Sequence, residues 1–142
     1  MEMSIDLETG CRIASINNDR LNDLVHNGHL PFLSRTNQGR ARRFSSADVV
    51  GLLMFQDLVS HGYCVRDAGM TASSMLAFCA DRPLAKTVAH AKLAMGGQDY
   101  IIGTPHDFSL GSDAGPTFGG LVIASMHIFN VAHARMLVAN GS

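Results

Sequence analysis

The residues with the clearest chemical potential are arginines. Four of them, Arg35, Arg40, Arg42 and Arg43, stand within nine residues and have no acidic residue among them. A guanidinium stays positively charged and suits the phosphates of a nucleic acid. The net charge of the chain is only −1. Exposed charges more than roughly 8 Å apart are largely screened at physiological salt, so the local excess of positive charge matters more than the total.

A second polar group precedes these arginines and contains Asn17, Asn18, Arg20 and Asn22. Asparagine can hydrogen-bond adenine, and arginine can hydrogen-bond guanine in a bidentate manner, through base edges in the major groove. These residue types predict base readout. The arginines of 35–43 predict contacts with phosphates or the minor groove, which position a protein on DNA. Asn17 and Asn18 also suit a helix cap or turn, which is compatible with DNA contact.

Patterns for catalysis or metal binding are weak. Ser109 and Ser112 lie near His106 and Asp107, but the segment has neither a GxSxG elbow nor the glycine spacing of GxGxxG or a P-loop. No HExxH or CxxC occurs. The three cysteines, Cys11, Cys64 and Cys79, are widely spaced. Cys64 and Cys79 are expected to be small buried hydrophobes rather than metal ligands. We therefore predict no enzymatic activity, no metal site and no cofactor.

The first clear helical pattern covers about residues 16–27, and the helix that it predicts would position the asparagines. Ser15 is a suitable N-cap, and Leu21 and Leu24 recur at helical spacing. Gly28 is suited to end this helix, because a residue without a Cβ atom adopts a positive φ at no steric cost.

The arginines must be positioned by residues 31–43, which carry Pro, Ser, Asn, Gly and Arg without a helical period. This composition predicts a loop or a two-stranded β-wing that turns near residues 37–39. Asn37 stands at that turn, and we include it among the expected DNA contacts.

Two further helices are expected after the wing. Ser45 and Asp48 have the spacing of a capping box, and the apolar residues behind them predict a helix that ends at His61 and Gly62. A second helix is predicted over 65–80. The remaining expected elements are a helix over 81–95, strands over 100–102 and 121–123, a loop over most of 103–120, and a helix over 126–138.

Length and composition fit a globular protein. A chain of 142 residues with 46% hydrophobic and 16% charged residues makes one domain, or one small domain and an appendage. No uncharged apolar stretch of 18 residues occurs, and the N-terminus has no basic region followed by an apolar one. We therefore expect neither a membrane span nor a signal peptide, and a cytoplasmic location.

The order of these features resembles the winged helix-turn-helix of MerR-type regulators, over roughly residues 11–80. In that family a recognition helix ends in a Gly-Leu-Leu-Pro-like turn. A basic wing, an aromatic residue and a Ser…Asp-Val helix start follow, and a Leu-x-x-x-Gly pattern closes that helix. The matching segments are Asn18-Asp19-Arg20-Leu21, Gly28-His29-Leu30-Pro31, Arg35, Gly39-Arg40-Ala41-Arg42-Arg43-Phe44-Ser45-Ser46-Ala47-Asp48-Val49 and Leu58-Val59-Ser60-His61-Gly62.

The sequence thus predicts a mostly α protein, with a MerR-like winged helix-turn-helix over residues 11–80 and a small α+β part over 81–142 for dimerisation or an effector. The resemblance implies a sequence-specific DNA-binding transcription regulator that docks the helix over 16–27 in the major groove of double-stranded DNA. We expect a homodimer, with residues 96–142 available to a protein partner. Two alternatives stay open: an excisionase-like architectural protein that bends DNA, and a protein-interaction adaptor that has kept the fold without DNA binding.

Overall fold

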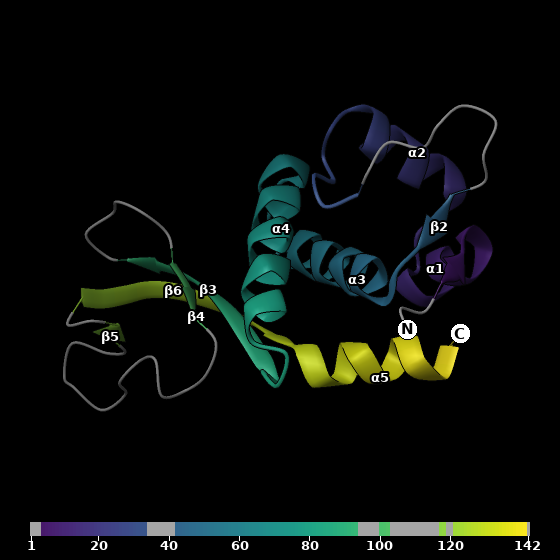
Figure 1. Ribbon diagram of the computed structural model, residues 1–142. Coiled ribbons are helices and arrows are strands. Elements are labelled where there is room, and N and C mark those ends of the chain that lie inside the picture. The colour runs from purple at the N-terminus through teal and green to yellow at the C-terminus, as the bar shows by residue number, and fades with distance from the viewer. Residues whose placement is uncertain (1–3, 34–41, 94–99, 103–116, 119–120, 142) are drawn as a thin grey trace.

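A computed structural model of the chain describes residues 4–33, 42–93, 100–102, 117–118 and 121–141. These residues form five helices and two small antiparallel sheets, in agreement with the expected mostly α class with a smaller β part (Figure 1). Among them, no helix has both the length and the apolar character needed to cross a membrane. The elements in chain order are β1 (Ile5–Asp6), α1 (Leu7–Ala14), α2 (Asn18–His26), β2 (Arg43–Phe44), α3 (Ser46–Ser60), α4 (Val65–Asp81), β3 (Thr87–Leu93), β4 (Tyr100–Ile102), β5 (Thr117–Phe118), β6 (Leu121–Asn130) and α5 (Val131–Gly141).

Helix α1 precedes the helix that the sequence pattern identifies first. Its buried face is built from the small residues Gly10, Cys11 and Ala14, which produce only a weak apolar signal. Gly10 lies so close to the ring of Phe44 that a Cβ atom would collide with it. The Asp6 carboxylate caps α1 by accepting a hydrogen bond of 2.8 Å from the Thr9 N–H.

Helix α2 begins two residues later than expected. Ser15, predicted as its N-cap, instead ends α1 in the left-handed conformation with φ 56°. Asn17 is the N-cap of α2, and its Oδ1 atom accepts a hydrogen bond of 2.7 Å from the Arg20 N–H. The prediction for Gly28 is confirmed, because this residue follows α2 with φ +74°.

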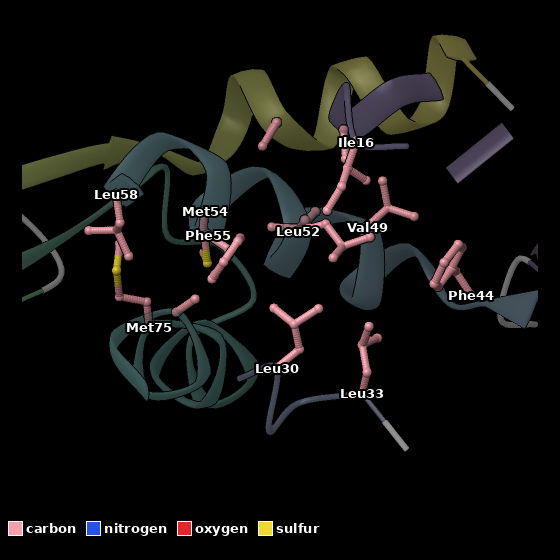
Figure 2. Close-up of a cluster of buried hydrophobic side chains, with 14 of the residues drawn as sticks. Ile16, Leu30, Leu33, Phe44, Val49, Leu52, Met54, Phe55, Leu58 and Met75 are labelled. Atoms are coloured by element: carbon pink, nitrogen blue, oxygen red, sulfur yellow. The ribbon is translucent and has the colours of Figure 1, made fainter. Parts of the chain in front are cut away.

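Helix α3 lies at the centre of the hydrophobic core. Its capping box is confirmed: Asp48 N–H donates to Ser45 Oγ, and Ser45 N–H donates to the Asp48 carboxylate. The helix ends at Ser60, and Gly62 follows with φ +97°. Helix α4 spans the range predicted for it. Figure 2 shows the buried cluster around α3, to which α4 contributes Met75.

The prediction of a helix over residues 81–95 is wrong. Residues 87–93 form strand β3, which pairs antiparallel with β6 from Thr87–Asn130 to Leu93–Ile123. Strands are confirmed at 100–102 and 121–123, but β6 continues to Asn130, so α5 begins at Val131 rather than at residue 126. Asn130 supplies a local reason for that start, because its Oδ1 accepts the backbone N–H of His133 at 2.9 Å.

The second sheet has the strand order β4-β3-β6-β5, and we call it the β arm. Figure 1 shows the β arm extending away from helices α1–α4, whereas α5 returns beneath them. Three side chains of α5 belong to the same core as α1–α4: Val131, Ala134 and Val138. The Arg12 guanidinium of α1 also donates a hydrogen bond of 2.9 Å to the carbonyl oxygen of Gly141. The C-terminal helix therefore packs in the same hydrophobic core as the N-terminal helices.

A close backbone contact between α4 and the segment after α2 makes Gly69 sensitive to substitution. A methyl group at this position would overlap the carbonyl oxygen of His29, which is a backbone atom and cannot move independently. We expect Gly69→Ala to lower the free energy of unfolding by roughly 1–3 kcal/mol, measured by denaturant unfolding. The control is Ser74→Ala on the exposed side of α4, which should leave stability equal or slightly higher. Parent-like stability of Gly69→Ala would contradict this contact.

Candidate functional site

Helix α2 buries one face and offers the other to solvent. Leu21 and Leu24 are buried in the core, and this contact fixes the rotation of the helix. The four residues that the sequence predicts for base readout are all exposed: Asn17, Asn18, Arg20 and Asn22. Asn17 uses its side-chain oxygen as the helix cap, so a capping role and an exposed position coincide in this residue.

The same exposed surface of α2 also carries negative charge. Asp19 and Asp23 are both exposed and stand four residues apart, on one side of the helix. Asp19 lies in the first turn, where a carboxylate is favoured by the positive end of the helix dipole. These carboxylates would repel phosphate, so they limit how α2 can approach a duplex.

The arginines expected on the wing fall into three situations. Arg35 and Arg40, together with Asn37, lie outside the described residues. Arg43 is exposed, and its Nε donates a hydrogen bond of 2.6 Å to Ser4 Oγ. Arg42 is only 9% exposed, which corrects the expectation that all these arginines lie at the surface.

The burial of Arg42 follows from the geometry of extended backbone. Successive side chains of extended backbone point to opposite faces, so Phe44 of β2 and Arg42, which directly precedes this strand, are buried while Arg43 is exposed. Arg42 lies near Cys11 of α1: burial raises the pKa of that thiol, and the Arg42 charge acts in the opposite direction. Arg42 therefore belongs to the packing of β2 on α1 rather than to a free surface.

Strands β1 and β2 close the segment that carries the other arginines. Ile5 pairs with Phe44 and Asp6 pairs with Arg43. The Asp6 carboxyl has a lowered pKa, mainly because it accepts hydrogen bonds from Thr9, with a smaller contribution from the nearby Arg43 and Arg12 charges. Both β2 and α2 pack against α1, so one short helix supports both parts of the predicted DNA-binding surface.

A second cluster of functional side chains lies at the other end of α3. Nε2 of His127, from β6, is 2.6 Å from Oδ2 of Asp57, from α3. Nδ1 of His61, the C-cap residue of α3, is 3.5 Å from the other carboxylate oxygen of Asp57. The two imidazole rings have centroids 4.6 Å apart. This cluster therefore joins a helix end to the β arm.

The cluster borders a cavity of about 420 Å³ that is lined by the start of α4 and by strands β3 and β6, as well as by the end of α3. Tyr63 is the central aromatic residue there. Its ring lies edge-on to His127 with a centroid distance of 5.9 Å, and its hydroxyl is 2.7 Å from Nδ1 of His90. Lys92 Nζ lies 5.4 Å from the centroid of the Tyr63 ring. The cavity thus combines imidazoles, a carboxylate, a phenol and an ammonium group.

Sequence reasoning did not identify this cluster. The four-residue spacing of Asp57 and His61 at a helix end is a local signal that could have indicated it, because such residues share a helix face. His127 is 70 residues from Asp57, and only the pairing of β6 with β3 places it beside the helix. Among the described residues, this is the one group of three such side chains with ligand atoms close enough to share a metal ion.

The cysteines do not share one environment. Cys79 is buried as expected, and Cys11 is buried as well. The expectation for Cys64 is wrong, because this residue is exposed and lines the cavity beside the histidines. Comparison with known proteins adds no assignment, because neither a family model nor a curated protein matches the chain.

The difference in exposure predicts selective thiol chemistry. In the folded protein we expect one thiol per chain, that of Cys64, to react rapidly with dithionitrobenzoate. Cys11 and Cys79 should react slowly, because burial both shields them and raises their pKa, and the thiolate is the reactive form. All three should react in denaturant. Cys64→Ser should remove the rapid phase, and a rapid phase that survives this substitution would refute the assignment.

Proposed function

We propose that the protein is a cytoplasmic, sequence-specific DNA-binding transcription regulator with a winged helix-turn-helix similar to that of MerR-type proteins. The observation that carries the proposal is the pair formed by α1 and α2. Only residues 15–17 separate the two helices, and α2 packs through Leu21 and Leu24 so that Asn18, Arg20 and Asn22 face solvent. Such side chains at the N-terminal end of an exposed helix suit base edges in the major groove.

The pairing of β1 with β2 adds support for a wing. The pairing brings residues 5–6 beside residues 43–44. The Arg-rich residues 35–43 follow α2 in the sequence and lead into β2. Arg43 is exposed at its base and is suited to a phosphate. We therefore assign contacts with the DNA phosphates to Arg35, Arg40 and Arg43. Arg42 is assigned a packing role instead.

One observation favours the second candidate, a protein-interaction adaptor. Asp19 and Asp23 are exposed on α2 and would face phosphate if the helix entered a groove with that side forward. An adaptor would keep the fold and use this mixed-charge helix face for a protein. Binding to DNA separates the two candidates directly.

The DNA proposal predicts different effects for the wing and the helix. We expect the triple variant Arg35→Ala, Arg40→Ala and Arg43→Ala to weaken binding to every duplex. The slope of log affinity against log salt should fall by about 0.9 for each phosphate that the variant no longer neutralises. Fluorescence anisotropy with a random-sequence duplex measures both effects. Arg82→Ala, at the end of α4 with its guanidinium over the Phe78 ring, is the matched control and should bind like the parent.

The helix variant Asn18→Ala with Asn22→Ala provides the contrast. For a DNA site selected from random sequences, the binding free energy should become less favourable by roughly 1–3 kcal/mol for each base that loses its contact with an asparagine. Binding to random-sequence DNA should stay close to that of the parent. The proposal fails if the parent shows no salt-dependent binding to DNA. The wing assignment fails if the triple arginine variant binds as tightly as the parent.

We also propose that the protein is a homodimer. Ile128 of β6 and Leu137 of α5 are 54% and 39% exposed, and both line a shallow cavity together with Leu53. Apolar side chains gathered at one surface suit a second copy, and paired subunits would present two recognition helices to two half-sites.

The dimer proposal predicts that Leu137→Asp shifts sedimentation from dimer to monomer, because a carboxylate cannot be buried there without a partner. Leu84→Asp is the matched control, since Leu84 is also an exposed leucine but lies in the turn between α4 and β3. A monomeric parent, or a dimer that Leu137→Asp leaves intact, would exclude this surface as the interface.

A further inference from the structure

We propose that Asp57, His61 and His127 bind a divalent transition-metal ion of the zinc class. Imidazole nitrogen and carboxylate oxygen are the ligand types that such ions accept, and two histidines with one carboxylate are enough for a site that keeps a position open. The proposal rests on the contacts of these three residues and is independent of DNA binding.

The ligand atoms are close enough to converge on one ion. One nitrogen from each histidine and one oxygen from Asp57 all lie within 4.8 Å of one another. Ligands bound tetrahedrally at the usual zinc distances stand roughly 3.4 Å apart. The 2.6 Å contact between His127 and Asp57 would therefore widen slightly, and His61 would move inward. The ion would lie between Nε2 of His127 and the Asp57 carboxylate, in place of the hydrogen bond that now joins them.

The exposure of the three side chains suits these movements. His127 is held in place, because its side chain is only 11% exposed and packs against the ring of Tyr63. His61 has more room to adjust, because its side chain is 58% exposed and stands at the end of α3. One ligand is thus preset by packing, and another can close onto the ion with little disturbance of the core.

The surroundings provide the remaining features of a metal site. The adjoining cavity of about 420 Å³ gives room for a water molecule or another ligand at the open coordination position. Nδ1 of His61 lies 2.8 Å from the backbone carbonyl oxygen of Asp57, and an N–H donated there would orient the ring and leave Nε2 as the nitrogen that binds the ion. Asp67 places a further carboxylate near the cluster, in the cavity wall.

A bound ion would also have a structural effect. Asp57 and His61 belong to the end of α3, whereas His127 belongs to β6, so one ion would connect the helical core to the β arm. Without an ion, the hydrogen bond between His127 and Asp57 contributes to that connection, together with the contact between Tyr63 and His90 and the core packing of Val88 and Phe129. Because the ion would bind the folded chain and not the unfolded one, it should raise the unfolding temperature.

The test uses the full chain without a polyhistidine tag, freed of metal by a chelator, with zinc chloride as the probe. Isothermal titration calorimetry should show one ion per chain, and thermal unfolding should move to higher temperature as zinc is added. His61→Ala should weaken zinc binding at least tenfold and abolish the zinc-dependent rise. This variant is decisive because its side chain is exposed and its metal-free fold should match that of the parent, as circular dichroism can verify.

Two further variants complete the test. Asp57→Asn keeps the size of the side chain but removes its charge, and should weaken zinc binding at least tenfold. His26→Ala is the matched control, because His26 is an exposed histidine on α2 and lies outside the cluster. The proposal is overturned if the parent binds no zinc, if His61→Ala binds zinc as tightly as the parent, or if His26→Ala weakens binding as much as His61→Ala does.

Discussion

The burial of α3 is the constraint on which the rest of the structure depends. Most of its turns carry buried side chains, and α1, α4, α5, β2 and β6 all pack against it. Its residues Leu52, Met54, Phe55 and Leu58 have almost no exposed surface, so each neighbouring element must supply a complementary apolar face. Figure 2 shows these side chains meeting those of the surrounding segments. A helix that is covered on nearly every side sets the positions of all its neighbours.

Both candidate sites follow from this central helix, and they lie at its opposite ends. The capping box at Ser45 starts α3 directly after β2, whose exposed Arg43 belongs to the proposed DNA-binding surface. The C-terminal end of α3 carries Asp57 and His61, which meet His127 from the β arm. A site at each end of one buried helix is held on a rigid element, and rigid elements position functional side chains better than loops do.

The surface proposed to bind DNA also shows how local rules interact. Asn17 caps α2 and is exposed next to Asn18, because a cap residue stands at the boundary where a helix begins. Arg42 and Arg43 are neighbours of the same type, yet strand alternation buries one and exposes the other. Composition alone could not separate these two arginines, because the difference arises from which face of β2 packs on α1.

Local residue patterns are enough to predict three features: the capping box of Ser45, the glycines that end α2 and α3, and the extent of α4. These features depend on side chains and backbone groups only a few residues apart, so a short stretch of sequence is enough to predict them. The elements α1 and β3 depend instead on distant contacts. The small residues of α1 pack against Phe44, and residues 87–93 form a strand because β6 pairs with them. Tertiary structure also brought His127 to Asp57, because a contact across 70 residues depends on the register of that pairing.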